Sequence, residues 1–271
     1  GLGHNVFESI TSADENVAIG SQALKATTSG GGNIAIGKDS LIANTIGNTN
    51  VAIGTDAMTT NVAADRNVAV GEQALQNMTA SSSTDTYNVG VGYNAGLSIN
   101  SGVKNTFVGG RAGDATTTAN ENTAVGYHSL GTNTTGADNV ALGAFSLFNN
   151  TTASFNTSVG SSAMETNTTG ANNTAVGYFA LLSNTTGANN AAVGFSSLNT
   201  NTTGASNTAL GRDALYSNTT ASNNTAVGQS ALNDNTTGAG GVAVGANALD
   251  ANTTGTRNTA VGQDALGGNT T

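Results

Sequence analysis

The chain lacks many of the residues with which proteins form cross-links, kinks and ionic surfaces. Its 271 residues include no cysteine, no proline and no tryptophan, and charged residues make up only 8% of it. Ordinary soluble domains are about a quarter charged, so amides and hydroxyls must solvate this surface. Because proline has no backbone N–H to donate, its absence favours a fold in which nearly every N–H joins a backbone ladder.

Positive charge is also scarce. The 16 acidic and 7 basic residues give a net charge of −9, which provides no electrostatic footprint for nucleic acid or an anionic membrane surface. No apolar run approaches the length of a membrane span, so we expect no membrane insertion in this segment. We expect any export signal or anchor to lie outside it. The lack of cysteine is compatible with every redox compartment.

The chain has few ionisable residues that could take part in catalysis. The two histidines, His4 and His128, fall seven repeats apart and are interpreted as exposed corner residues. Catalysis needs groups whose pKa can be tuned and which lie together. We therefore expect no enzyme and no cofactor.

A strict internal repeat determines the predicted architecture. A glycine closes a short apolar run every 17 residues, with one interval of 21 between Gly71 and Gly92. Valine, isoleucine, leucine and alanine recur at fixed places, which argues against disorder. The glycines are Gly3, Gly20, Gly37, Gly54, Gly71, Gly92, Gly109, Gly126, Gly143, Gly160, Gly177, Gly194, Gly211, Gly228, Gly245 and Gly262.

Each repeat contains a strand-like run, a second apolar anchor and a corner. In Asn173–Gly177 (Asn-Thr-Ala-Val-Gly) the larger residues alternate with alanine, which is the period of a strand, and we expect the valine to anchor the core. Four residues after each glycine, a leucine or methionine such as Leu181 is the second anchor, in a second short extended run. In Asn-Thr-Thr-Gly, the glycine and asparagine favour a corner through positive φ.

A 17-residue unit is too short for a strand–helix–strand crossover or a helix pair. The predicted fold is therefore an all-β, parallel β-solenoid (β-roll) of about sixteen coils. We expect residues 1–271 to form a single repeat array whose two ends both fall within a repeat. Since one coil buries little apolar area, we also expect neighbouring chains to contribute to stability.

The asparagine that precedes each strand is predicted to form a structural ladder. Stacked in register, such side chains can hydrogen-bond amide to amide, as asparagine ladders do in cross-β stacks. Gly241 is the one exception. The ladder residues are Asn16, Asn33, Asn50, Asn67, Asn88, Asn105, Asn122, Asn139, Asn156, Asn173, Asn190, Asn207, Asn224 and Asn258.

A second asparagine rank begins each Asn-Thr-Thr corner and matches the N-glycosylation acceptor pattern. It can be a glycosylation stripe, or it can follow simply from repeating one turn sequence. The possible acceptors are Asn133, Asn150, Asn167, Asn184, Asn201, Asn218, Asn235, Asn252 and Asn269.

The four-residue insertion lies in residues 80–87 and is expected to be a surface loop. Insertions in repeat arrays often map to the binding face, although a tolerated loop is the simpler interpretation. Stacked carboxylates could hold Ca²⁺, but most coils carry no acid at that position, so we expect no metal. A Thr-Thr pair presents one outward rank and not the Thr-x-Thr double rank of an ice-binding face. The acidic positions are Asp39, Asp56, Asp213 and Asp264.

The strand motifs resemble those of a known family. Asn16–Gly20, Asn50–Gly54 and Asn67–Gly71 are similar to the head repeats of trimeric autotransporter adhesins, and the motif recurs along nearly all of the chain. The resemblance implies a left-handed parallel β-roll, three chains about a common axis, and binding to host surfaces. The period departs from the usual 14 residues, and the 17-residue form is similar to repeats in phage and bacterial tail-fibre-like proteins.

These observations together predict a non-enzymatic structural and adhesive segment of an extracellular surface fibre or filament. The expected partners are copies of itself, as a homotrimer or an end-to-end polymer, and host or cell-surface glycans or proteins. Two alternatives stay open. One is the shaft of a phage tail fibre for host attachment, and the other is a glycosylated filament subunit that stacks end to end.

Overall fold

The computed structural model describes residues 1–80 and 82–271, in two compact units, Gly1–Ala137 and Asp138–Thr271. The described residues form strands and turns and no helix. No helix long and apolar enough to cross a membrane is therefore found in them.

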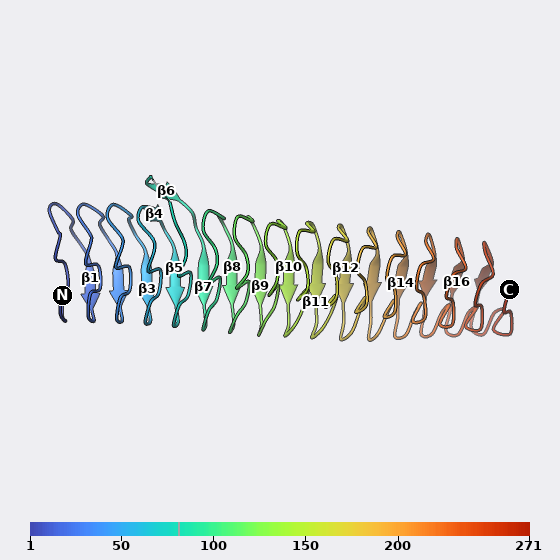
Figure 1. The fold of residues 1–271 in the computed structure, drawn as a ribbon. Coiled ribbons are helices and arrows are strands. Elements are labelled where there is room, and N and C mark those ends of the chain that lie inside the picture. Colours follow the sequence, from blue (N-terminus) through green and yellow to red (C-terminus); the bar gives the residue numbers. More distant parts are fainter. Residues whose placement is uncertain (81) are drawn as a thin grey trace. The chain divides into compact units, whose positions relative to one another are not determined.

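Short strands recur through both units (Figure 1). In the first unit they are β1 (Val17–Ile19), β2 (Ile34–Ile36), β3 (Val51–Ile53), β4 (Ala64–Asp65), β5 (Val68–Val70), β6 (Thr84–Asp85), β7 (Val89–Val91), β8 (Thr106–Val108) and β9 (Thr123–Val125). In the second unit they are β10 (Val140–Leu142), β11 (Thr157–Val159), β12 (Thr174–Val176), β13 (Ala191–Val193), β14 (Thr208–Leu210), β15 (Thr225–Val227), β16 (Val242–Val244) and β17 (Thr259–Val261).

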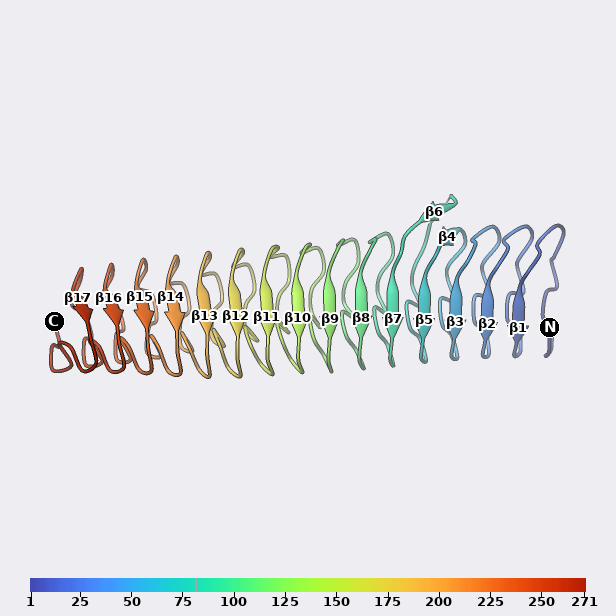
Figure 2. The ribbon, with the colours of Figure 1, turned by 180° about the vertical axis from the view of Figure 1, so that it is seen from behind.

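The strands stack in parallel and in register, which confirms the predicted β-solenoid. In the first unit the sheet order is β1-β2-β3-β5-β7-β8-β9, and in the second unit the strands follow in sequence order from β10 to β17 (Figures 1 and 2). Each residue pairs with the one a repeat later, as Ala175 does with Ala192. At the first predicted strand, the pairing is reduced to an isolated bridge between Leu2 and Ile19.

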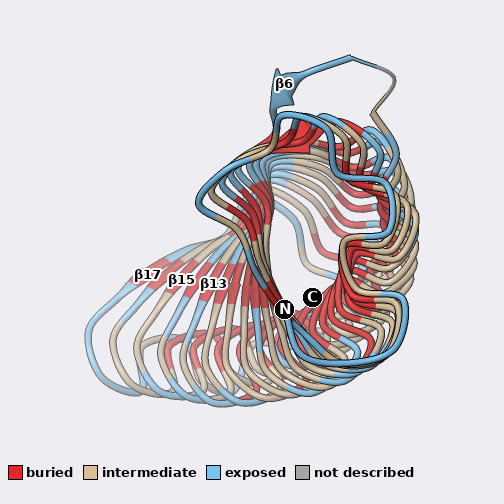
Figure 3. Cartoon of the chain, turned by 90° about the vertical axis from the view of Figure 1, so that its left-hand side faces the viewer, coloured by how far each residue is buried: buried red, intermediate tan, exposed pale blue. Residues whose placement is uncertain are grey.

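The strands face opposite to the expected direction. The central alanine points into the coil and the two larger residues point out: Ala18 is 1% exposed, whereas Val17 and Ile19 are 45% and 41% exposed. The predicted valine anchor was therefore wrong. The interior of each coil holds alanine from the strand and the leucine or methionine of the second anchor, such as Leu24. In Figure 3, buried residues recur at the same place in successive coils of each unit.

The segment around the second anchor is a series of turns, so the predicted second extended run was also wrong. Two residues in it have positive φ, for example Gln22 at 62° and Leu24 at 49°. With this geometry the N–H groups of the two residues point to opposite sides of the coil. Gln22 donates to the carbonyl of His4 in the preceding coil, and Leu24 donates to the carbonyl of Ser40 in the following coil. Positive φ at a leucine costs free energy, and hydrogen bonds to both neighbouring coils offset that cost.

The Asn-Thr-Thr-Gly corner does not use positive φ, contrary to expectation. Its glycine is there because the corner approaches the next coil closely. A Cβ on Gly187 would lie 2.3 Å from the carbonyl oxygen of Gly204 and 2.4 Å from Asn184 Oδ1. Positive φ occurs instead at the residue before the strand asparagine, such as Asn189 at 59°.

In one region of the first unit, a large side chain in the strand is matched by small residues in the two flanking turns. Phe107 occupies the inward strand position that is alanine in most coils, and it is fully buried. Gly96 and Gly113 occupy the leucine position of the two flanking turns, with φ of 61° and 58°. A Cβ would lie 2.8 Å from the Phe107 ring at Gly96 and 2.5 Å from it at Gly113. The aromatic ring therefore fills space that leucine side chains fill in other coils.

The insertion adds a small second sheet. β6 pairs in parallel with β4, with Ala64 opposite Thr84 and Asp65 opposite Asp85. β6 stands out from the coils in Figure 3. Of the segment predicted as a loop, residue 81 lies outside the described residues.

Candidate functional site

The strand asparagines form an internal ladder in both units, and the predicted amide-to-amide hydrogen bonds are present in it, as from Asn190 Nδ2 to Asn173 Oδ1 and from Asn207 Nδ2 to Asn190 Oδ1, both at 3.2 Å. Backbone N–H groups donate to the same Oδ1 atoms. The backbone N–H of Asn190 donates to Asn173 Oδ1 at 2.9 Å. Asn173 Nδ2 donates across the coil to the carbonyl of Gly187 at 2.9 Å. The same pattern recurs in both units, and at the exception the N–H of Gly241 donates to Asn224 Oδ1. The ladder therefore ties neighbouring coils together through buried groups, although Asn156 Nδ2 makes no hydrogen bond within the described residues.

The corner asparagines form a second buried ladder beside the first. Asn184 Nδ2 donates to Asn167 Oδ1 at 2.7 Å and to the carbonyl of Gly187 at 2.9 Å. The Gly187 carbonyl thus accepts from both asparagine ranks, Asn173 and Asn184. This shared carbonyl makes the two ranks into one polar spine inside the coil.

Most of the corner asparagines that were considered as glycosylation acceptors are buried. Within the second unit, Asn150, Asn167, Asn184, Asn201, Asn218 and Asn235 are fully buried, and in the first unit so is Asn133. Asn252 is 1% exposed, and Asn269 in the last coil is partly exposed. A sugar on a buried Nδ2 would displace its hydrogen bonds and force the coil open, so the buried asparagines cannot be acceptors in the folded coils.

The outward strand face is the most unusual surface of the molecule. Each three-residue strand in the main sheets presents two outward side chains, and none of these is charged. Exposed aliphatic residues on this face include Val17, Ile19, Ile53 and Val125 in the first unit, and Val193, Leu210, Val244 and Val261 in the second unit. We call these two outward ranks the aliphatic face. The rank at the third strand residue is valine, isoleucine or leucine in every strand of the main sheets, and the rank at the first is threonine in β8, β9, β11, β12, β14, β15 and β17. Exposed apolar surface that repeats in this way is unusual for a chain with no partner to cover it.

Aromatic side chains extend the aliphatic face in the second unit. Tyr178 and Phe195, each directly after a strand glycine, stack with ring centroids 5.7 Å apart. The guanidinium of Arg212 lies 5.9 Å from the Phe195 centroid. The two rings are about half exposed, although burying them would be favourable.

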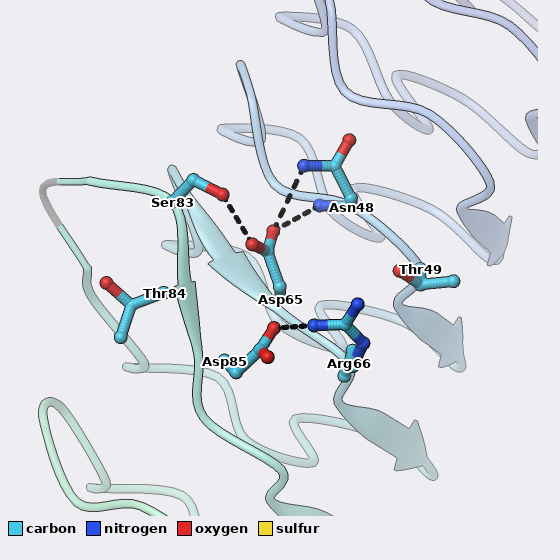
Figure 4. Close-up of a pocket in the computed structure, with 7 residues that line it drawn as sticks. All are labelled: Asn48, Thr49, Asp65, Arg66, Ser83, Thr84 and Asp85. Atoms are coloured by element: carbon cyan, nitrogen blue, oxygen red, sulfur yellow. Dashed lines mark hydrogen bonds and ion pairs between the residues drawn. The ribbon is translucent and has the colours of Figure 1, made fainter.

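A polar hollow lies beside the insertion in the first unit (Figure 4). It is lined by Asn48, Thr49, Asp65, Arg66, Ser83, Thr84 and Asp85. In Figure 4 the Asp65 carboxylate lies between Asn48 and Ser83, and Arg66 pairs with Asp85. The sequence analysis identified the insertion but not these partners. The signal available was Asp65 itself, an acid at a position where the two preceding repeats have Asn48 and Gly31 and the repeat before them has Asp14.

The predicted acidic positions do not gather into a metal site. Among the described residues, no group of three or more His, Cys, Asp or Glu side chains is placed to hold a metal ion. Asp39 and Asp213 instead lie beside Lys38 and Arg212, at 3.5 Å and 2.9 Å.

Asp114 and Lys104, in two neighbouring coils of the first unit, have shifted pKa values. Burial raises the pKa of the Asp114 carboxyl above its usual 3.8, and His128 and Arg111 oppose this shift more weakly. On the surface, the hydrogen bond from Lys104 to Glu121, at 2.8 Å, raises the pKa of Lys104.

Replacing Asp114 with asparagine is expected to raise the melting temperature near neutral pH. Because the folded protein binds the Asp114 proton more tightly than the unfolded chain, this group lowers stability as pH rises from 3.8 through its raised pKa. Near pH 2 the carboxyl is protonated in both states, so the two proteins should melt together. Thermal unfolding followed by circular dichroism checks this, and equal melting temperatures at both pH values would contradict it.

The sequence matches no protein-family model, and no curated protein matches it. The fold therefore defines the class, a parallel β-solenoid repeat protein with 17-residue coils.

Proposed function

We propose that this chain is a non-enzymatic structural and adhesive segment of an extracellular fibre, on a cell surface or a virion, built from copies of itself. The β-solenoid supplies stiffness, because every coil is bonded to its neighbours by backbone ladders and asparagine ladders. A surface rich in neutral amides and hydroxyls, with 8% charged residues and no thiol, suits repeated weak contacts outside the cell.

The observation that carries this proposal is the aliphatic face. A rank of exposed valine, isoleucine and leucine side chains, without a charge at any strand, is costly to leave in water. Copies of the chain can bury such a face against one another in a closed assembly, through a self-complementary contact in a dimer or through head-to-tail contacts in a trimer. The face runs along the sides of the coils, which favours side-by-side association, as in a homotrimer, over an end-to-end polymer.

The molar mass in solution tests self-association. We expect light scattering to give a whole multiple of the 26.5 kDa chain mass. Leu210→Lys should reduce the particle to one chain, because Leu210 is 47% exposed in the single chain and lies at the centre of a rank of aliphatic side chains. Thr203→Lys is the matched control, since Thr203 is an exposed corner residue away from the strands.

The results separate the possibilities. A single chain for the unmodified protein would overturn self-association through this face. An assembly that survives Leu210→Lys but grows with concentration without limit would instead favour end-to-end polymerisation.

A further inference from the structure

The hollow beside the insertion is the one place where the 17-residue repeat is broken. The insertion brings β6 against β4, and this pairing places residues of three successive segments around one depression. These segments contribute Asn48 and Thr49, then Asp65 and Arg66, then Ser83, Thr84 and Asp85 (Figure 4). All of them belong to the first unit, so a single chain builds the hollow.

The Asp65 carboxylate at the floor of the hollow is held by hydrogen bonds from the chain itself. Asp65 is 7% exposed, and its Oδ1 accepts from the N–H of Asn48 at 2.6 Å and from Asn48 Nδ2 at 3.3 Å. Its Oδ2 accepts from Ser83 Oγ. These three donors hold the carboxylate in position. The hydrogen bond from Ser83 also ties the insertion to the coil that contains Asp65.

The rim of the hollow has unused hydrogen-bonding capacity. Arg66 and Asp85 form an ion pair with about half of each side chain exposed. Within residues 1–80 and 82–271, Arg66 donates through only one guanidinium nitrogen, and the exposed hydroxyl of Thr49 makes no hydrogen bond. Asp85 Oδ2 accepts from Tyr87 Oη at 2.9 Å, which orients the carboxylate. Guanidinium donors thus stand beside carboxylate acceptors at the rim of the hollow.

We propose that this hollow binds a neutral saccharide. Vicinal hydroxyls of a sugar can donate to Asp85 and accept from Arg66, and the Thr49 hydroxyl can do either. Two carboxylates against one guanidinium leave the site net negative, which disfavours sialic acid, sulfate and phosphate. The guanidinium beside Asp85 disfavours a divalent cation. The inference goes beyond fibre assembly and does not depend on it.

Ligand-observed NMR with the full chain tests this inference. The probes are the methyl glycosides of glucose, galactose, mannose and N-acetylglucosamine, each titrated separately, with sialic acid, inorganic sulfate and CaCl₂ as competing classes. We expect at least one neutral glycoside to bind, and Arg66→Gln or Asp85→Asn to weaken it at least about tenfold, since each removes a charged hydrogen-bond partner. Arg212→Gln and Asp213→Asn remove an exposed ion pair outside the hollow and should leave the affinity unchanged.

Each other outcome would overturn the inference. These are no binding of any neutral glycoside, binding that the Arg66 and Asp85 variants do not weaken, and preferred binding of sialic acid, sulfate or Ca²⁺. Because Arg66 and Asp85 lie at the surface, the variants should keep the circular dichroism spectrum of the unmodified protein. A single-chain mass in solution would overturn self-association without affecting this result, so the two proposals fail separately.

Discussion

Replacing Phe107 with alanine is expected to lower the free energy of unfolding of the unit that contains it by about 3–5 kcal/mol. The ring is fully buried, and the neighbouring positions that could fill the space are Gly96 and Gly113. The cavity should therefore persist. Urea unfolding followed by circular dichroism measures the change.

Restoring the usual residues around the cavity provides the control. The double variant Phe107→Ala, Gly113→Leu returns both positions to the residue common in other coils and should recover part of the loss, because the three nearest atoms to a Cβ at Gly113 all belong to the Phe107 ring. Gly96 is left unchanged, since a Cβ there would also lie 2.7 Å from Leu75 Cδ2. Leucine is acceptable there because Leu75 and Leu130 adopt the same turn with φ of 48° and 53°. Gly113→Leu alone should destabilise, because its side chain meets the Phe107 ring. A double variant no more stable than Phe107→Ala would contradict the interpretation that the ring fills the space of the missing leucine.

Replacing the corner asparagine Asn201 with alanine should lower the free energy of unfolding by about 2–3 kcal/mol, because buried hydrogen bonds of the polar spine are lost. Asn201 Nδ2 donates at 2.9 Å to both Asn184 Oδ1 and the Gly204 carbonyl. Its Oδ1 accepts from Asn218 Nδ2 at 2.8 Å. In Asn201→Ala, two buried amides each lose a partner.

A matched variant separates structure from glycosylation. Thr203→Ala also destroys the Asn-Thr-Thr acceptor pattern, but Thr203 is exposed and its hydroxyl makes no hydrogen bond within the described part of the chain. Thr203→Ala should therefore unfold like the unmodified protein. Equal destabilisation by both variants, or a loss of attached sugar mass in both, would show that the acceptor pattern matters and not the buried amide.

The sequence pattern predicted the fold class well because the coil is defined by repetition. A 17-residue unit that repeats in phase must place Ala175 beside Ala192, and no longer-range information is needed to set that register. Which side chains of each strand point into the coil could not be predicted in the same way. Alternation shows that two faces differ, but both alanine and valine are apolar, and the larger residue was expected inside.

The width of the coil explains why alanine faces inward. Leu24 and its equivalents already occupy the interior, so a strand residue opposite them must be small. Phe107 is the exception that supports this explanation, because it fits only where the flanking leucines are replaced by Gly96 and Gly113. Packing across the coil therefore outweighs the preference of the larger side chain for burial.

The sequence by itself determined the 17-residue period, the parallel stacking and the two asparagine ranks, because these follow from local residues repeated in phase. Only the tertiary structure decided which side of each strand faces water, since that depends on the space left by side chains from other parts of the coil. It also decided that both asparagine ranks share one buried carbonyl. The hollow at Asp65 and Asp85 arises in the same way, because the inserted arm brings together side chains that lie 20 residues apart in the sequence.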